Sequence, residues 1–336
     1  MRLWSRRRQK VKTITLALQG GGAHGAYTWG VLDRLLEDPR LIIEGISATS
    51  AGAMNAAVLA QGLTTGGPEG ARAALESFWR HVSEAAQATP FQSTWLGRWL
   101  RSFASNMMTP MFSPYQFNPL NLNPLRDLLI KTIDFESLRE SSRVTLFISA
   151  TNVRNGKIKV FETRDVSADV LMASACLPFL YRAVEIDGEP YWDGGYMGNP
   201  PIFPLIYNCA SQDVVLIMVN PIVIDEVPKT AQAIFDRINT LSFNSSLMRE
   251  MRAINFVTKL VDSGFTDGGR LKRMFIHCID AEDEMRKLGG SSKLNAQWDF
   301  LMYLHRLGRE RGEAFLAAHY DRLGVESSTD ILERFL

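Results

Sequence analysis

The sequence predicts a three-layer α/β/α sandwich around a largely parallel sheet, with an insertion rich in aromatic residues, Met and Pro. Three observations predict this fold class. Apolar segments with the length of strands alternate with segments that have the apolar spacing of helices. Two of the strand-like segments end in glycine-containing turns that lead directly into a helix. Alternation of this kind is typical of parallel sheets that helices cover on both faces.

The expected elements follow one another along the whole chain. The first strand is expected at 13–18 with its helix at 27–36, and the second strand at 42–48 precedes helices at 51–61 and 72–86. Beyond the insertion, the patterns predict helices at 124–132, 167–176, 231–261 and 296–322, strands at 144–150, 157–162 and 214–219, and a hairpin turn at 183–190.

We expect one main domain at 13–265, preceded by a basic tail at 1–12. A C-terminal strand and helices at 266–336 are expected to pack on the same domain. The regular pattern stops at 90–124, where aromatic residues and Met are interrupted by prolines. This insertion either packs on the main domain or forms a lid or acyl-chain groove.

The most informative segment is the glycine loop, residues 20–25, which directly follows the first strand. It reads G-G-G-A-H-G. A strand that leads through glycines into a helix exposes backbone N–H groups at close range, and the helix start adds unpaired donors. Such a loop holds an anion, which is either a phosphate or the oxyanion of a reacting ester.

The phosphate interpretation rests on the spacing Gly20-x-Gly22-x-x-Gly25, which matches the dinucleotide-binding pattern. That pattern also requires an acidic residue at the end of the next strand, and Glu44 follows the apolar run 41–43. The spacing alone is a weak signal, so a nucleotide site stays an alternative.

A second strand–turn–helix unit carries a serine. Residues 48–52 read A-T-S-A-G, close to the G-x-S-x-G nucleophile elbow, in which a sharp turn exposes the hydroxyl group of Ser50. A frame centred on Ser47 lacks the closing glycine, and the simpler alternative for Ser50 is a helix N-cap. With an elbow nearby, the glycine loop is better explained as an oxyanion hole.

No histidine has a spacing that marks it as the base for this serine. Four lie in helix-like stretches or an apolar run, which favours packing or surface roles: His81, His277, His305 and His319. The fifth, His24, lies inside the glycine loop, where it is a candidate substrate contact.

An aspartate stands out at the end of a short hairpin. Asp193 is followed by Gly194 and Gly195, so its carboxylate can approach another loop closely. The alternative is a turn without chemistry, since Asp-Gly is common in turns. A second Asp-Gly-Gly, at Asp267, lies among polar residues and is expected to be a plain loop.

In this order, the glycine loop, the serine elbow and the Asp193 turn resemble the patatin-like phospholipases. The resemblance extends over about 13–221 and includes the segments 173–178 and 192–201. It implies a Ser-Asp dyad without histidine, in which Ser50 is the nucleophile and Asp193 accepts its proton and later activates water. It also implies an oxyanion hole formed by Gly20, Gly21, Gly22 and Ala23. The residues that support these motifs are Gly25, Ala48, Gly52, Gly194 and Gly195.

The chain departs from the family pattern at two positions. Ala48 replaces the usual glycine, which is expected to distort the elbow modestly. His24 replaces a usual Arg or Lys, and its protonation is expected to strengthen attraction for a lipid phosphate. Because an ordinary aspartate is a weak base at neutral pH, burial must raise the pKa of Asp193, or the oxyanion loop must carry more of the catalysis.

Composition limits the remaining choices. The 336 residues carry a net charge of +1 at pH 7, which argues against a general nucleic-acid binder. The cysteines at 176, 209 and 278 are scattered, so we expect no disulfide framework, metal or cofactor. No apolar run is long enough to span a membrane. We expect a cytoplasmic protein, with peripheral contact to anionic membrane through residues 2–12 and 91–117 as a further hypothesis.

Three functions follow from these observations. The first is a lipid acyl hydrolase that cuts ester bonds of phospholipids or lysophospholipids. The second is an esterase, or a depolymerase of a storage polyester, with the same chemistry. The third is a non-catalytic lipid-binding protein, for which the departure at Ala48 is the support.

Overall fold

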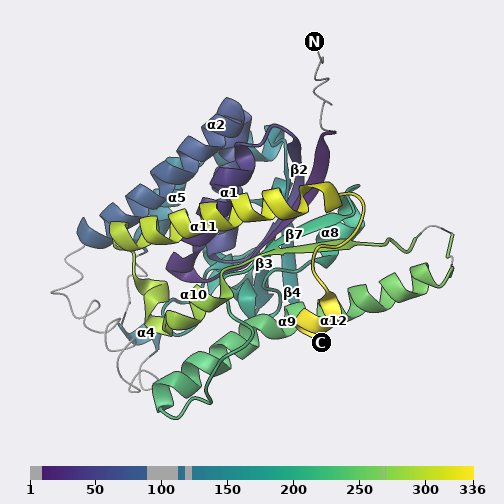
Figure 1. Ribbon diagram of the computed structural model, residues 1–336. Helices are drawn as coiled ribbons and strands as arrows, with labels where there is room; N and C mark the ends of the chain where they lie inside the picture. The colour runs from purple at the N-terminus through teal and green to yellow at the C-terminus, as the bar shows by residue number, and fades with distance from the viewer. Residues whose placement is uncertain (1–9, 89–112, 118–122, 266, 269) are drawn as a thin grey trace.

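An eight-stranded sheet lies at the centre of the computed structural model (Figure 1). The structure describes residues 10–88, 113–117, 123–265, 267–268 and 270–336. Across the sheet the strands follow the order β5-β6-β3-β2-β1-β7-β8, and β4 pairs with β3. The strands are β1 (Lys12–Leu18), β2 (Leu41–Ala48), β3 (Thr145–Asn152), β4 (Ile158–Glu162), β5 (Val184–Ile186), β6 (Glu189–Asp193), β7 (Asp213–Ile217) and β8 (Phe275–Ile279).

Most of this sheet is parallel. The pairs β3/β2, β2/β1, β1/β7 and β7/β8 are parallel, whereas β4, β5 and β6 add antiparallel pairs at one side. The predicted largely parallel sheet is therefore confirmed. The C-terminal strand β8 pairs with β7, so the C-terminal segment extends the same sheet.

Helices precede, connect and follow the strands, and most lie where the apolar spacing predicts them. The helix predicted at 124–132 is observed with these bounds, and the one predicted at 231–261 ends one residue later. The helices are α1 (Gly25–Leu36), α2 (Ala51–Ala88), α4 (Pro114–Phe117), α5 (Pro124–Thr132), α6 (Phe135–Ser141), α7 (Ala168–Ser174), α8 (Phe203–Asn208), α9 (Ala231–Asp262), α10 (Glu282–Lys287), α11 (Trp298–His319) and α12 (Ile331–Phe335).

Two helical layers cover the two faces of the sheet. Along β1, Ile14, Leu16 and Leu18 belong to the larger core under α1, α2 and α11, because alternate side chains of a strand point to one face. Ala17 points to the other face, in a core shared with α8, α9 and α12. Figure 1 shows α1, α2 and α11 gathered on one side and α8, α9 and α12 toward the other. This arrangement is the predicted α/β/α sandwich.

Side-chain caps explain several helix starts. Asn123 accepts a hydrogen bond from the N–H group of Leu125 just before α5, and Pro124 occupies the first helical position. Ser167 caps α7 in the same way. The long element α2 is interrupted at Gly67, whose φ of 64° is not helical, so two helices form where two were predicted.

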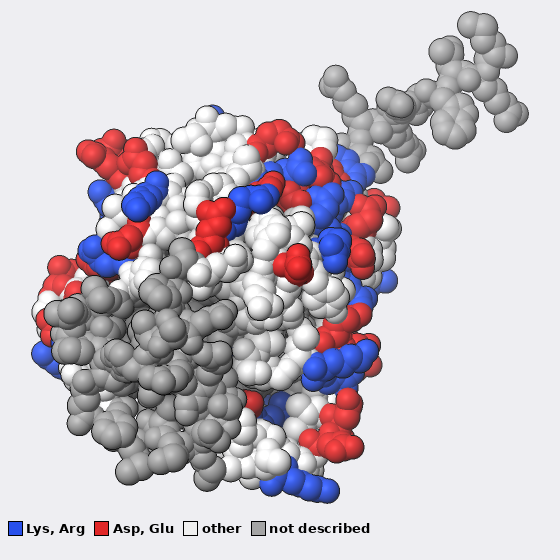
Figure 2. Space-filling view, turned by 90° about the vertical axis from the view of Figure 1, so that its left-hand side faces the viewer, with Lys and Arg blue, Asp and Glu red and all other residues white. Residues whose placement is uncertain are grey.

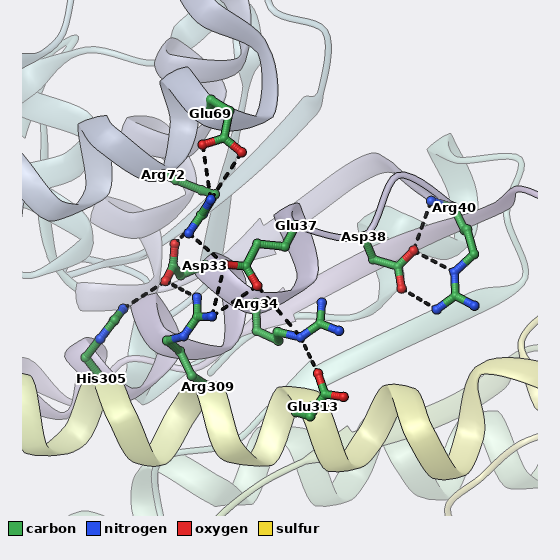
Figure 3. Close-up of polar contacts among 10 residues, drawn as sticks. All are labelled: Asp33, Arg34, Glu37, Asp38, Arg40, Glu69, Arg72, His305, Arg309 and Glu313. Carbon is green, nitrogen blue, oxygen red and sulfur yellow. Dashed lines mark hydrogen bonds and ion pairs between the residues drawn. The ribbon is translucent and has the colours of Figure 1, made fainter.

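A cluster of charged residues joins α1, α2 and α11 (Figure 3). The Asp33 carboxylate of α1, which is nearly buried, accepts hydrogen bonds from Arg72 of α2 at 2.7 Å, from His305 of α11 at 3.1 Å and from Arg309 of α11. Glu37 accepts hydrogen bonds from a second guanidinium nitrogen of both Arg72 and Arg309. These contacts hold the pKa of Asp33 well below its usual range, against the opposing effect of its burial.

Several predictions concern residues outside those described. They are most of the basic tail, residues 1–9, and most of the insertion, residues 89–112 and 118–122. Lys12, assigned to the tail, begins β1 instead and donates a hydrogen bond to the carbonyl oxygen of Leu323. No described helix is long and apolar enough to cross a membrane. On the face shown in Figure 2, basic and acidic side chains are interspersed around a broad uncharged area.

Candidate active site

The glycine loop and the serine turn lie side by side at one edge of the sheet. β1 and β2 are adjacent parallel strands, and their last residues, Leu18 and Ala48, are partners in the register. The loops that follow therefore leave the sheet at the same edge. A Cβ atom added to Gly20 would lie 2.6 Å from Cβ of Ser50, so the two loops are in contact.

Ser50 has the backbone geometry of a nucleophile elbow. Its φ angle is 55°, in the left-handed region that is strained for residues other than glycine. Its N–H group donates a hydrogen bond of 2.9 Å to Ser174 Oγ, and Ser50 itself is partly exposed. Gly52 lets the helix begin close to β1, because a Cβ atom there would lie 2.4 Å from the carbonyl oxygen of Leu18.

The alanine at position 48 is compatible with this turn. Ala48 ends β2, is completely buried and belongs to the core between the sheet and α2. Ser50 keeps the left-handed φ angle with alanine two residues before it. Ser47, the rival for the elbow serine, is buried and donates its hydroxyl hydrogen to the carbonyl oxygen of Pro201.

Asp193 lies at the same edge of the sheet as Ser50. It ends β6, where it is the register partner of Ala150 in β3, and only 1% of its surface is exposed. Its N–H group donates to the carbonyl oxygen of Cys176, and its Oδ1 accepts a hydrogen bond of 2.7 Å from the N–H group of Gly195. Ser50 lines the same cavity as Asp193, and its hydroxyl group lowers the pKa of this carboxylate. The structure therefore brings the two residues of the expected dyad together.

Burial raises the pKa of Asp193 to about 7. The N–H group of Gly195, the hydroxyl group of Ser50 and the positive charge of Lys293 oppose this rise, in that order. Of the two expected alternatives, a raised pKa of Asp193 or a larger contribution from the oxyanion loop, the burial of Asp193 favours the first. A carboxylate with such a pKa is a much better proton acceptor at neutral pH than an ordinary aspartate.

The residues of the glycine loop differ in whether their N–H groups donate to another described residue. The N–H group of Gly20 donates a hydrogen bond of 2.7 Å to Asn199 Oδ1, so the prediction that Gly20 donates to an oxyanion is corrected. No described residue accepts a hydrogen bond from the N–H groups of Gly21 or Gly22. Gly25, the last residue of the loop, begins α1, and its carbonyl oxygen accepts a hydrogen bond from Asn55.

Polar side chains that sequence reasoning missed hold the glycine loop in place. Oε1 of Gln19 accepts hydrogen bonds from the N–H groups of Val219 and Asn220, which joins the ends of β1 and β7. Nδ2 of Asn220 donates a hydrogen bond of 2.7 Å to the carbonyl oxygen of Gly20. Asn199 lies inside the motif segment 192–201, which is the signal that could have found it.

Lys293 is a further residue that sequence reasoning missed, since nothing in the surrounding sequence marks it. It lies in the short 3-10 helix η6 (Gly290–Leu294), whose backbone packs on the glycine loop. A Cβ atom at Gly22 would lie 2.3 Å from the carbonyl oxygen of Lys293, and Gly22 has a φ of 59°. The Lys293 ammonium group donates a hydrogen bond of 2.7 Å to Asn220 Oδ1.

A cavity of about 430 Å³ adjoins Ser50 and Asp193. Gly21, Gly22 and Ala23 line it on one side. The rest of its described wall is mainly apolar and includes Met54, Phe78, Trp79, Leu125, Leu177 and Phe243. A cavity of this composition accommodates a hydrocarbon chain, and a few polar groups at one end would orient the chain.

His24 is not placed as expected. Only 2% of its surface is exposed, and its Nε2 lies 2.7 Å from Ser292 Oγ. Burial, with a smaller effect of the positive charge of Lys293, lowers the pKa of His24 to about 3. The hypothesis of a protonated His24 that attracts lipid phosphate is therefore wrong. His24 lines a neighbouring cavity rather than the one that contains Ser50.

The other candidate residues serve the fold. Glu44 accepts hydrogen bonds from the N–H groups of Ala210 and Ser211, away from the glycine loop, which removes the acidic residue that a dinucleotide site requires. Asp267 accepts from backbone N–H groups of its own loop, as expected for a plain turn.

His277 contacts Asp213 at 3.0 Å and Ser328 at 2.9 Å, an arrangement that superficially resembles a catalytic triad. However, His277 is completely buried, and none of the three residues lines the cavity beside Ser50. No described histidine forms a hydrogen bond with Ser50 or Asp193.

A parallel α/β sandwich with a serine turn beside a glycine loop is typical of α/β esterases. The family model described as Patatin-like phospholipase matches residues 16–206, more than half of the 336 residues. The chain belongs to this family and is a lipid acyl hydrolase that acts on ester bonds.

Several solved structures are similar to this chain, two of which are VipD and the ExoU–SpcU complex. VipD from Legionella pneumophila has 15% sequence identity and a TM-score of 0.45, over 96% of this chain and 72% of that one. The heterodimeric ExoU–SpcU complex from the type III secretion system of Pseudomonas aeruginosa has 15% identity and a TM-score of 0.36, over 94% of this chain and 53% of that one. No protein with a curated description matches the sequence.

Proposed function

We propose that Ser50 and Asp193 form a catalytic dyad that hydrolyses the acyl ester bonds of phospholipids and lysophospholipids. The observation that carries this proposal is the shared cavity wall that holds Ser50, at a strained turn, together with the buried carboxylate of Asp193, whose pKa is about 7. The apolar cavity beside these residues supports a lipid substrate.

In the first half of the proposed reaction, Asp193 accepts the hydroxyl proton while Oγ of Ser50 attacks the ester carbonyl carbon. The carbonyl oxygen becomes an oxyanion, which the N–H groups of Gly21, Gly22 and Ala23 would stabilise. Cleavage of the carbon–oxygen bond leaves an acyl group on Ser50. The leaving alcohol takes the proton from Asp193.

In the second half, Asp193 accepts a proton from water, whose oxygen attacks the acyl carbonyl carbon. The same N–H groups stabilise the second oxyanion. Breakage of the bond to Ser50 releases a fatty acid, and Asp193 returns its proton to Oγ of Ser50. The net reaction consumes one ester and one water and produces one acid and one alcohol.

Two other functions share some of these features. An esterase, or a depolymerase of a storage polyester, would use the same residues on a different substrate. A non-catalytic lipid-binding protein would keep the cavity but lack turnover. The backbone of Ser50 argues against the latter, since a strained turn of this kind serves to expose a reacting side chain.

A serine-reactive fluorophosphonate tests the nucleophile. We expect labelling of the wild-type protein and none of Ser50→Ala. Asp193→Asn should lose labelling and turnover, whereas the matched control Asp267→Asn should retain both, because Asp267 lies in a loop remote from Ser50. Full turnover in Asp193→Asn would exclude the dyad.

The substrate class is tested by the products formed from a defined phospholipid, a short-chain ester and a polyester. Release of fatty acid from the phospholipid by the wild type but not by Ser50→Ala supports the lipid acyl hydrolase. Turnover confined to the polyester or to short-chain esters supports the second function instead.

Peripheral contact with anionic membrane also stays a proposal. It rests on the basic residues of 2–12 and the aromatic residues of 91–117, most of which lie outside the described residues. Co-sedimentation with anionic and zwitterionic vesicles, with and without residues 1–9, measures the contribution of the tail.

A further inference from the structure

Lys293 lies where two cavities meet. It lines the cavity of about 430 Å³ that contains Ser50, and it also lines a neighbouring cavity of about 540 Å³. The walls of both cavities also share Leu177, Leu180, Phe235, Asn239 and Leu294. A ligand that extends from Ser50 into the second cavity would therefore lie against this shared wall, in which Lys293 is the charged residue.

The ammonium group of Lys293 is held at a fixed position relative to the glycine loop. Nζ donates to Oδ1 of Asn220, and Nδ2 of the same Asn220 donates to the carbonyl oxygen of Gly20, each at 2.7 Å. The hydrogen bond between His24 and Ser292 joins η6 to the loop a second time. Through Asn220, Lys293 thus helps to hold the loop that would form the oxyanion hole.

The ammonium group of Lys293 has few hydrogen-bond acceptors and few oppositely charged groups among the described residues around it. Lys293 and Asp193 carry the ionisable amino and carboxyl groups of the described wall around Ser50. The hydrogen bond to Asn220 occupies one of three N–H groups, and no described residue accepts a hydrogen bond from the other two. A partly satisfied ammonium group at the end of an apolar cavity favours an anionic ligand.

The second cavity has a basic excess. Its described wall carries Lys229, Arg237, Arg286 and Lys293 against the two acidic residues Glu226 and Asp236, and because Arg286 is paired with Asp225 and Asp283 outside this wall, the excess amounts to one positive charge. A polar and negatively charged group is therefore better accommodated here than in the apolar cavity beside Ser50. The two cavities together match an amphiphile whose acyl chain and anionic group lie on either side of the reacting ester.

We propose that Lys293 binds the phosphate group of a glycerophospholipid while its acyl ester lies at Ser50, and that this contact selects phospholipids over neutral lipids. This inference rests on the proposed function. In such a lipid only a few covalent bonds separate the phosphate from the ester, which suits one ammonium group beside the reacting centre. Lys293 lies outside residues 16–206, so the family match does not include it.

The protonation state of Lys293 is compatible with this role. Burial lowers its pKa to about 8, while Asp236 on α9 and Asp193 on β6 raise it by their negative charges. The third titratable group that faces it is His24 of η1, which is neutral because its pKa is about 3. Lys293 is therefore mostly positively charged at pH 7, and it loses this charge as the pH rises through about 8.

Equilibrium binding tests the contact independently of turnover. The probes are a short-chain diether phosphatidylglycerol and the corresponding diether glycerol, both as monomers and both resistant to hydrolysis, titrated into Ser50→Ala by calorimetry. We expect tighter binding of the phospholipid. Lys293→Met in this background should weaken that binding about 10- to 100-fold, the loss of one charge-assisted hydrogen bond, and Lys293→Arg should restore much of it.

Kinetics with the two matching diesters provide a second readout. Lys293→Met should lower the ratio of kcat/KM for phospholipid over diacylglycerol about 10- to 100-fold, mainly through KM. Lys287→Met removes the same charge from an exposed residue that lines neither cavity, so the ratio should not change. For the wild type, kcat/KM on the phospholipid should fall above about pH 8, and this fall should be absent for diacylglycerol.

Several outcomes would overturn the proposal. Unchanged phospholipid binding in Lys293→Met would exclude the contact. Equal losses on both substrates would show that Lys293 acts only through Asp193 or the glycine loop. Binding of inorganic phosphate as tight as that of the phospholipid would indicate a site for a free anion. If the wild type hydrolyses neither diester but shows the expected binding, the proposed function fails while the phosphate contact stands.

Discussion

Oδ1 of Asn199 accepts a hydrogen bond of 2.7 Å from the N–H group of Gly20. Both residues are essentially buried, and Asn199 lies six residues after Asp193 along the chain. This bond therefore connects the glycine loop to the segment that carries the proposed base. It fixes the position of the glycine loop and therefore the positions of the N–H groups of Gly21 and Gly22.

Replacement of Asn199 by alanine should impair this positioning. Asn199→Ala leaves the buried N–H group of Gly20 without a partner, which costs about 1–3 kcal/mol. We expect kcat to fall about 10- to 100-fold, with a smaller change in KM, since a displaced loop weakens contacts to the oxyanion more than contacts to the acyl chain. Steady-state kinetics on a short-chain ester measure both constants.

The matched control for this variant is Asn155→Ala, because Asn155 is exposed in a turn away from the site. It should retain wild-type kinetics. An increase in KM for Asn199→Ala with kcat unchanged would contradict a positioning role for Asn199.

The raised pKa of Asp193 predicts the pH dependence of catalysis. The proposed base must be ionised, so kcat/KM on a neutral ester should rise with pH through about 7 and then level off. The positive charge of Lys293 lowers the pKa of Asp193, so Lys293→Met should move the midpoint to higher pH. A midpoint near pH 4 in the wild type would mean that Asp193 titrates as an exposed carboxylate.

The same pKa predicts how Asp193 affects stability. Its value is about 7 in the folded protein, above the ordinary 3.8 expected for the unfolded chain. The protein is therefore destabilised by this group as the pH rises from about 4 through 7. A difference of about three pH units corresponds to about 4 kcal/mol, and Asp193→Asn, which cannot ionise, removes this penalty.

Urea unfolding of the wild type and Asp193→Asn checks this prediction. Near pH 4 the two free energies of unfolding should be similar, and at pH 8 the variant should be more stable by up to about 4 kcal/mol. Asp267→Asn is the control and should show no such gain. A variant that is less stable than the wild type at pH 8 would contradict the cost of burying this charge.

Gly52 provides a test of the serine turn. In Gly52→Ala the new methyl group would lie 2.4 Å from the carbonyl oxygen of Leu18, so the start of α2 has to move away from β1. We expect a loss of about 1–3 kcal/mol in unfolding free energy and much slower reaction of Ser50 with a fluorophosphonate. Gly66→Ala is the control, because no atom lies within 4 Å of its added Cβ. Equal effects of the two substitutions would exclude a special role for the close approach at Gly52.

Asp33 tests the charged cluster that joins α1, α2 and α11. Asp33→Ala leaves Arg72, His305 and Arg309 without their shared partner, and we expect a loss of about 3 kcal/mol in the free energy of unfolding. Glu69→Ala removes an exposed partner of the same Arg72 and should cost less than about 1 kcal/mol. Urea unfolding at pH 7 distinguishes the two variants, and a similar loss in both would contradict the importance of burial.

Local sequence signals were sufficient for most of the secondary structure and for the two central residues of the site. Strands β1 and β2 were predicted because apolar runs end in glycine or serine turns, and helix starts such as that of α5 carry their own caps. The Ser50 turn was predicted because residues 48–52 alone set its geometry. Asp193 was found because two glycines follow it at the end of a strand.

The sequence by itself thus determined most of the strands, the longer helices and the choice of Ser50 and Asp193, since local patterns mark each of them. The short helices α6, α8, α10 and α12 and the order of the strands in the sheet were decided by the tertiary structure. Only the tertiary structure decided that Gly20 donates to Asn199, that His24 is neutral and that Lys293 lies beside the glycine loop. These features depend on contacts between segments far apart in the chain, for which no local pattern exists. The pKa values of His24, Asp193 and Lys293 shift mainly because folding removes their side chains from water.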